Sequence, residues 1–224
     1  MLNDLVQIFP KEVILVCGSP NAGKTLFALN VALLNKDIYP IKENGDKPIY
    51  HFVSEMGPAA FNDMLTRVSP SIMVDEYDER IEVLVYKPNS IQDQIHPHAI
   101  NIVDYLEPKN DDYREIVPTI NAIYRKLQSG VAVVCVQQPI GRDPRGGVSV
   151  FEKPRLAIAL MIDKQRHCCM AEIIKGKNNK TGRSSIHGLE LDYRVDRRGT
   201  LIRPLMDSWK FRDPRERKAY NTDF

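Results

Sequence analysis

Long apolar runs, a strong net charge and internal repeats are all missing from this 224-residue sequence. No apolar run approaches ~18 residues and no signal peptide opens the chain, so we expect no membrane span and a cytoplasmic protein. The formal net charge is only +2, so a surface that binds nucleic acid would have to be local. The absence of repeats argues against a solenoid, and the absence of low-complexity linkers argues against several domains joined by flexible linkers.

Cysteines are few and lack the spacing of metal ligands. Two of the four lie in predicted buried strands, Cys17 and Cys135, and the other two, Cys168 and Cys169, are adjacent. None has a C-x₂-C or H-x₃-H partner nearby. We therefore expect four reduced thiols and no zinc site.

A complete phosphate-loop motif stands near the start of the chain. Residues 18–25 read Gly-Ser-Pro-Asn-Ala-Gly-Lys-Thr, which fits G-x-x-x-x-G-K-[ST]. Gly18 and Gly23 allow a tight turn that brings backbone N–H groups to phosphate oxygens. Lys24 can reach the β- and γ-phosphates, and the Thr25 hydroxyl can hold Mg²⁺.

The sequence on each side of this motif supports it. The apolar run 12–17 predicts a buried strand, and apolar spacing over 25–34 predicts a helix. Phosphates bound by the loop would meet the free N–H groups and the dipole of that helix. The predicted nucleotide-binding residues are Gly18, Ser19, Pro20, Asn21, Ala22, Gly23, Lys24, Thr25 and Leu26.

Predicted strands and helices alternate over most of the chain. The strands are predicted at 47–54, 81–86, 100–105 and 131–136, and the helices at 57–68 and 113–127. This alternation indicates an α/β fold with a mostly parallel sheet and helices on both faces. Beyond about residue 168 the predicted strands 169–174, 184–193 and 200–203 suggest antiparallel additions at the C-terminal end. We expect one domain over 1–204 and a polar tail or arm over 205–224.

Polar residues at the predicted strand ends can supply chemistry around a bound nucleotide. Asp104 ends a core strand opposite the phosphate loop, where a carboxylate can hold the Mg²⁺ shell. Glu55 ends another strand and can act as general base toward water, but Glu107 competes for this role. Gln138 follows the strand at 131–136 and can contact a γ-phosphate through its amide, or can be a solvated loop residue.

A basic segment follows Gln138. Residues 139–183 hold ten Lys or Arg and four Asp or Glu, a local charge of +6. We predict that Arg142, Arg145 and Lys153 contact the backbone of single-stranded nucleic acid, which needs no base readout. Phe151 is nearly alone as an aromatic residue there, so stacking is expected to be minor. The alternative is a solvated basic loop.

These motifs resemble, in order, those of the motor domain of the DnaB-type replicative helicases, which are RecA-like P-loop ATPases. Residues 52–56 resemble the motif whose Glu is the catalytic base, which favours Glu55 over Glu107. The other matching stretches are 18–30 (first motif), 103–106 (Walker B), 133–138 (sensor strand), and 172–177 with 181–182 (late strand and hairpin).

The resemblance spans about residues 8–193 and carries further expectations. It implies an ATPase that uses ATP and Mg²⁺, a homo-oligomer in the form of a hexameric ring, and a primase or other replication partner. It also implies that Gln138 is a sensor and that Lys177 is an interface lysine reaching a neighbour's ATP. The family's finger Arg is replaced by Asn179, and Lys180 or Arg183 can stand in for it.

The leading interpretation is a helicase-like ATPase that couples hydrolysis to translocation on, or remodelling of, single-stranded nucleic acid. Single-stranded DNA is the expected ligand, with RNA left open. We expect no primase-binding domain, because the motifs begin within the first dozen residues, as in a trimmed protein of a bacterium, phage or other mobile element. Two alternatives stay open: a nucleotide-gated loader or scaffold, and a P-loop kinase of small molecules, which Ser54-Glu55-Met56 argues against.

Overall fold

The computed structural model of the protein describes most of the chain. The described residues are 2–37, 47–68, 80–88, 90–108, 112–138, 144–163, 168–195, 202–205 and 209–211. Of the predicted site residues, Arg142 lies outside these ranges, as does most of the predicted tail.

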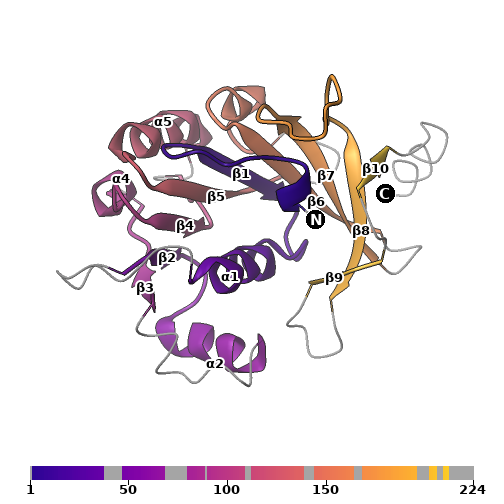
Figure 1. The fold of residues 1–224 in the computed structure, drawn as a ribbon. Helices are drawn as coiled ribbons and strands as arrows, with labels where there is room; N and C mark the ends of the chain where they lie inside the picture. Colours follow the sequence, from indigo (N-terminus) through magenta and orange to yellow (C-terminus); the bar gives the residue numbers. More distant parts are fainter. Residues whose placement is uncertain are drawn as a thin grey trace.

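The described residues form one ten-stranded sheet. Its strands are β1 (Val13–Gly18), β2 (Ile49–Val53), β3 (Ile81–Val85), β4 (Ile100–Asp104), β5 (Val131–Gln137), β6 (Leu156–Asp163), β7 (Cys168–Gly176), β8 (Leu189–Val195), β9 (Ile202–Pro204) and β10 (Lys210–Phe211). The order is β10-β8-β7-β6-β1-β5-β4-β2-β3, with β9 also paired to β8 (Figure 1). Strands β1 to β6 pair in parallel and β7 to β10 pair antiparallel, which confirms the predicted fold class.

Helices cover both faces of the parallel part of the sheet. Figure 1 shows α1 (Lys24–Asn35) and α2 (Pro58–Val68) on one face and α4 (Ile91–Gln94) and α5 (Ile116–Lys126) on the other. The helix predicted over 113–127 is a 3₁₀ turn, η3 (Tyr113–Glu115), followed by α5. Within the described ranges, no helix is long and apolar enough to cross a membrane.

Two hydrophobic cores result from this layering. Alternate residues of a strand point to opposite faces, so Val133 and Cys135 of β5 pack in the core with Leu29 of α1. Val134 of the same strand packs in the other core with Ile120 of α5. Because both faces are covered, the central strands are mostly apolar, as expected for buried parallel strands; the exceptions include His51 in β2 and Asn101 in β4.

Strand β6 is the main element that the sequence analysis does not predict. It lies within the basic segment 139–183, where the Lys and Arg residues flank an apolar run, Leu-Ala-Ile-Ala-Leu-Met-Ile. The strand pairs in parallel with β1 and antiparallel with β7, so it joins the two halves of the sheet. Part of the predicted tail also joins the sheet, because Lys210 and Phe211 form β10 beside β8.

The position of β6 predicts unequal effects for one substitution made at two sites. Ile158 is fully buried and Ile162, in the same strand, is 42% exposed. We expect Ile158→Ala to lower the free energy of unfolding by about 2–5 kcal/mol, because it leaves a cavity. The matched control Ile162→Ala should cost less than about 1 kcal/mol. Urea denaturation measures both, and equal losses would contradict the placement of β6.

Candidate nucleotide-binding site

The phosphate loop connects β1 to α1, as the motif predicts. Gly18 is the last residue of β1, and a Cβ there would lie only 2.8 Å from the carbonyl oxygen of Leu160 in β6. Gly23 caps the N-terminus of α1 with φ of 86°, a left-handed conformation that side chains disfavour. Both glycines therefore have a structural reason: one allows close strand packing and the other allows the turn into the helix.

The loop is held in shape by its own residues and by a distant strand. The N–H of Ala22 donates to the carbonyl of Ser19 at 3.1 Å, and Asn21 has a positive φ of 63°. From β8, the hydroxyl of Tyr193 donates to the carbonyl of Ala22 at 3.4 Å. Pro20 and Asn21 are exposed, while Ala22 is fully buried.

Lys24 places a charge inside the loop. Its ammonium group donates to the carbonyls of Gly18 at 3.0 Å and Ser19 at 2.9 Å, and the residue is 7% exposed. Burial lowers the pKa of Lys24, and the negative charges of Glu55 and Asp104 act in the opposite direction. The lysine is therefore close enough to both carboxylates for their charges to influence its ionisation.

Asp104 ends β4 with its carboxylate buried. The residue is 5% exposed, and its Oδ1 has no hydrogen-bond partner among the described residues. An unpaired buried carboxylate oxygen suits a hard cation such as Mg²⁺, as does the Thr25 hydroxyl in the first turn of α1. The chemistry of these oxygens fits a magnesium ion, although no cluster of three His, Cys, Asp or Glu residues that could hold a metal is found among the described residues.

The two candidate bases differ in their surroundings. Glu55 follows β2 and is exposed, and the adjacent Ser54 ties this strand end to β4, since its N–H donates to the Asp104 carbonyl at 3.0 Å. Glu107 is partly buried, and its charge adds to burial, the larger cause, in raising the pKa of Tyr105 to about 12. Both carboxylates lie at the same edge of the sheet.

Gln138 also lies next to the phosphate loop. Its N–H donates to the carbonyl of Gly18 at 2.9 Å, so the end of β5 is directly beside the end of β1. We call this side of the sheet, which holds Gly18, Lys24, Asp104 and Gln138, the phosphate-loop edge. The structure thus brings together residues that lie up to 120 positions apart in the sequence (138 minus 18).

Two cations of the basic segment, Arg145 and Lys153, lie beside η3 and α5. The guanidinium of Arg145 lies 4.5 Å from the ring centroid of Tyr113, at the start of this helical region. The ammonium of Lys153 lies 5.0 Å from the ring centroid of Tyr124, in its last two turns. Aromatic residues near the predicted contacts were expected to be scarce, but α5 and η3 supply them.

Lys177 lies at the opposite edge of the sheet. Its N–H donates to the carbonyl of Arg155 at 3.0 Å, and the N–H of Arg155 donates to the carbonyl of Val13 at 3.1 Å. Val13 begins β1 and Gly18 ends it, so at ~3.3 Å per residue about 16 Å separates the two ends. Lys177 is therefore remote from the phosphate loop of its own chain.

Two residues near the site were not predicted. His51 in β2 is fully buried, and its Nε2 lies 3.8 Å from Oδ2 of Asp104. A histidine inside an otherwise buried strand was a signal that could have identified it. Tyr193, which supports the phosphate loop, gives no such signal, because it is 171 positions from its partner Ala22.

The architecture is found in several solved structures. The chain superimposes on a KaiC-like protein from the hyperthermophilic archaeon Pyrococcus horikoshii, with TM-score 0.66 and 15% identity over 88% of this chain and 90% of that one. The ATPase domain of G40P gives 0.62 and 16% over 89% and 86%, and the RadB recombinase gives 0.60 and 15% over 85% and 90%. The sequence itself matches no family model and no curated protein.

These similarities identify the fold as that of the RecA-like P-loop ATPases. The same architecture occurs in a KaiC-like protein, in the ATPase domain of G40P and in the RadB recombinase. At 15–16% identity, the similarity to these structures establishes the fold and does not select among their activities.

The environment of Lys24 predicts its contribution to ATP binding. A hydrogen bond to a charged group is worth about 1.5–3 kcal/mol, so Lys24→Ala should raise the Kd for ATP roughly 10- to 100-fold. The matched control is Lys87→Ala, which removes an exposed lysine after β3. Fluorescent-nucleotide titration measures both variants, and equal Kd values would contradict the assignment of the loop.

Proposed function

We propose that this protein binds ATP with Mg²⁺, hydrolyses it, and couples hydrolysis to movement along or remodelling of single-stranded nucleic acid. The observation that carries the proposal is the complete phosphate loop, placed between β1 and α1, with the buried Asp104 at the end of β4, which only β5 separates from β1. A fold shared with a helicase ATPase domain and a recombinase supports the choice of nucleic acid.

The phosphates of ATP bind at the N-terminus of α1 in this proposal. Backbone N–H groups of the loop and the helix dipole favour the anion, and Lys24 adds a charge-assisted contact. Bound Mg²⁺ neutralises part of the phosphate charge, and Thr25 and Asp104 are the residues that would hold it. Gln138 lies beside Gly18, where its amide can contact the γ-phosphate.

Glu55 is the proposed general base. Its carboxylate is exposed at the phosphate-loop edge and acts electrostatically on Lys24, so it can face water next to the phosphates. Glu107 is the weaker candidate because it is partly buried, whereas Glu55 is exposed to water. The resemblance to the helicase motif favours the same choice.

Lys177 is the proposed cation that one subunit supplies to the ATP of its neighbour. The two ends of β1 are about 16 Å apart, which argues against a role for Lys177 at the phosphate loop of its own chain. Lys177 is exposed and makes no side-chain hydrogen bond or ion pair with another described residue. The nearby Ile8 and Phe9 are 37% and 46% exposed, which is compatible with a subunit contact on this face.

The neighbouring cations have other contacts. The ammonium of Lys175 donates to two backbone carbonyls, and Arg183 lies 5.5 Å from the ring centroid of Phe211. The N–H of Lys180 donates to the carbonyl of Leu5 at 2.8 Å, which ties this part of the chain to the N-terminal segment. Asn179, at the position of the family's finger Arg, bonds within its own turn to Thr181. Lys177 is our choice because the resemblance singles it out and the side chains of Lys175 and Arg183 have contacts of their own.

Single-stranded nucleic acid is proposed to lie along the basic segment on α5. The helical region from Tyr113 in η3 to Tyr124 in α5 extends about 16 Å at ~1.5 Å per residue, and the strand would lie along it. Arg145 marks the end nearer the phosphate loop, since its N–H donates to the carbonyl of Gln137. A ring of subunits, hexameric as in the resembling helicases, would repeat this surface around the strand.

The choice between the two bases can be tested with one kind of substitution. We expect Glu55→Gln to keep ATP binding but to lower turnover by about 10²-fold or more, because an amide cannot accept the proton of water. Glu107→Gln is the matched control and should change turnover only slightly. Phosphate-release assays at saturating ATP compare them, and the reverse order would transfer the role to Glu107.

The nucleic-acid surface can be tested through salt dependence. Losing one phosphate contact should flatten the log–log slope of affinity against salt by ~0.7 for single strands. We expect this change for Arg145→Ala and for Lys153→Ala, measured by fluorescence anisotropy with labelled oligo(dT). Arg67→Ala on α2, whose guanidinium is paired with Asp63, is the control. Unchanged slopes in both test variants would move the nucleic-acid site elsewhere.

Phosphate-release assays with and without single-stranded DNA separate the alternative functions. Turnover stimulated by single strands supports the motor, whereas nucleotide binding without turnover would indicate a loader or scaffold. Stimulation by a small metabolite instead of nucleic acid would indicate a kinase.

A further inference from the structure

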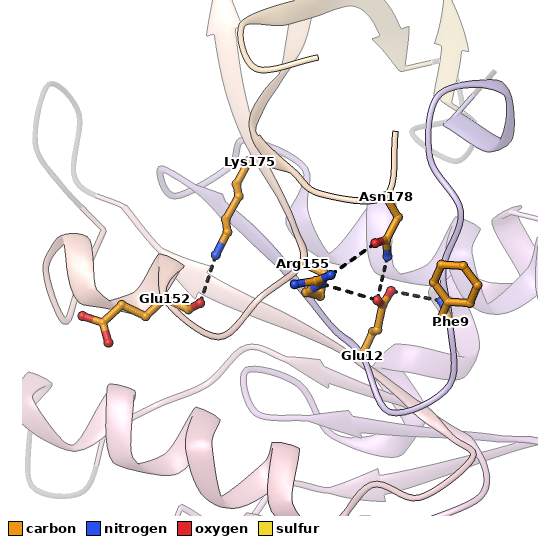
Figure 2. A network of polar contacts seen from close by, with 6 residues as sticks. All are labelled: Phe9, Glu12, Glu152, Arg155, Lys175 and Asn178. Atoms are coloured by element: carbon orange, nitrogen blue, oxygen red, sulfur yellow. Dashed lines mark hydrogen bonds and ion pairs between the residues drawn. The ribbon is translucent and has the colours of Figure 1, made fainter. Parts of the chain in front are cut away.

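In the sequence, Lys177 lies between Lys175 and Asn178, whose side chains contact other parts of the fold. Figure 2 shows these two side chains and their partners. On one side, the ammonium of Lys175 donates to the carbonyls of Phe151 at 2.5 Å and Glu152 at 2.9 Å. On the other side, the amide of Asn178 donates to Oε1 of Glu12 at 2.6 Å. The backbone of Lys177 is therefore held from both directions, while its own side chain is exposed.

Glu12 is the centre of the second attachment. It is 7% exposed and directly precedes β1. Its Oε2 accepts the N–H of Phe9 at 3.0 Å, and its Oε1 lies 3.7 Å from Nε of Arg155. One carboxylate thus joins the N-terminal segment, the start of β6 and the residue next to Lys177.

Backbone hydrogen bonds join the same parts of the chain as these side-chain contacts. The N–H of Gln7 donates to the carbonyl of Asn178 at 2.9 Å, and Lys177 and Arg155 are joined by the hydrogen bond described above. The Asn178 side-chain oxygen also accepts from the guanidinium of Arg155 at 3.4 Å. The segment that carries Lys177 is consequently attached to the amino end of β1 by several independent bonds.

We propose that Glu12, acting through Asn178, positions Lys177 for the nucleotide of the neighbouring subunit. This inference rests on the proposed role of Lys177. Strand β1 then serves two ATP sites: its carboxyl end leads into the loop for the subunit's own ATP, and its amino end holds the lysine for the next. A misplacement of ~1 Å can lower a catalysed rate about 10²-fold, so loss of this attachment should be visible in turnover.

The test uses the full chain with two variants of the attachment. Asn178→Ala removes the link to Glu12, and Glu12→Gln keeps the size of the side chain but removes its charge. We expect both to bind ATP with wild-type affinity while hydrolysis falls about 10- to 100-fold. Ser184→Ala, exposed in the same connection between β7 and β8, is the control and should keep the wild-type rate.

Mixing experiments distinguish positioning from a general structural defect. Lys24→Ala subunits lack a working phosphate loop but have an intact Lys177 segment, so they should restore hydrolysis to either attachment variant. They should restore Lys177→Ala protein in the same way. If Asn178→Ala fails to fold, Glu12→Gln alone carries the test.

The experiments distinguish failure of the positioning role from failure of the proposed role of Lys177. Wild-type hydrolysis by both attachment variants would overturn the positioning role. So would a loss that Lys24→Ala subunits cannot rescue while they do rescue Lys177→Ala. If Lys177→Ala itself is not rescued, the proposed role of Lys177 at a shared site is wrong, and this inference fails with it.

Discussion

Strand β1 is the constraint on which the rest of the structure depends. It pairs in parallel with β5 on one side and with β6 on the other, so its position cannot change without breaking two ladders. Gly18 at its end lets β6 approach closely, and the turn through Gly23 then starts α1 against the same sheet. Both ends of the phosphate loop are therefore fixed to regular structure, one to β1 and the other to α1.

Two charged side chains are buried beside the phosphate loop. Lys24 and Asp104 are both nearly buried at the phosphate-loop edge, where lysine donates to loop carbonyls and one carboxylate oxygen is unpaired among the described residues. Electrostatic interactions are stronger in such an environment than in water, and they need little reorganisation when an anion binds. The opposite edge carries exposed charge, which suits contact with a second subunit.

Local patterns predicted most of the parallel half of the fold, because covered strands are mostly apolar and the phosphate loop has a fixed spacing. Strand β6 was missed because its charged flanks dominate the composition of its segment. Contacts made by Tyr193 with the loop, and by Glu12 with Asn178, join residues more than 160 positions apart. Such pairs depend on strand order, which periodicity does not reveal, so only the folded chain identifies them.

The central claim is that hydrolysis needs two subunits, with a phosphate loop from one and a lysine from the other. ATP turnover per subunit, measured from nanomolar to micromolar protein at saturating ATP, tests it most directly. The account predicts a rate that is low in dilute protein, rises with concentration and reaches a plateau once the oligomer is fully assembled. A constant rate per subunit across this range, in protein that is monomeric at the low end, would contradict it.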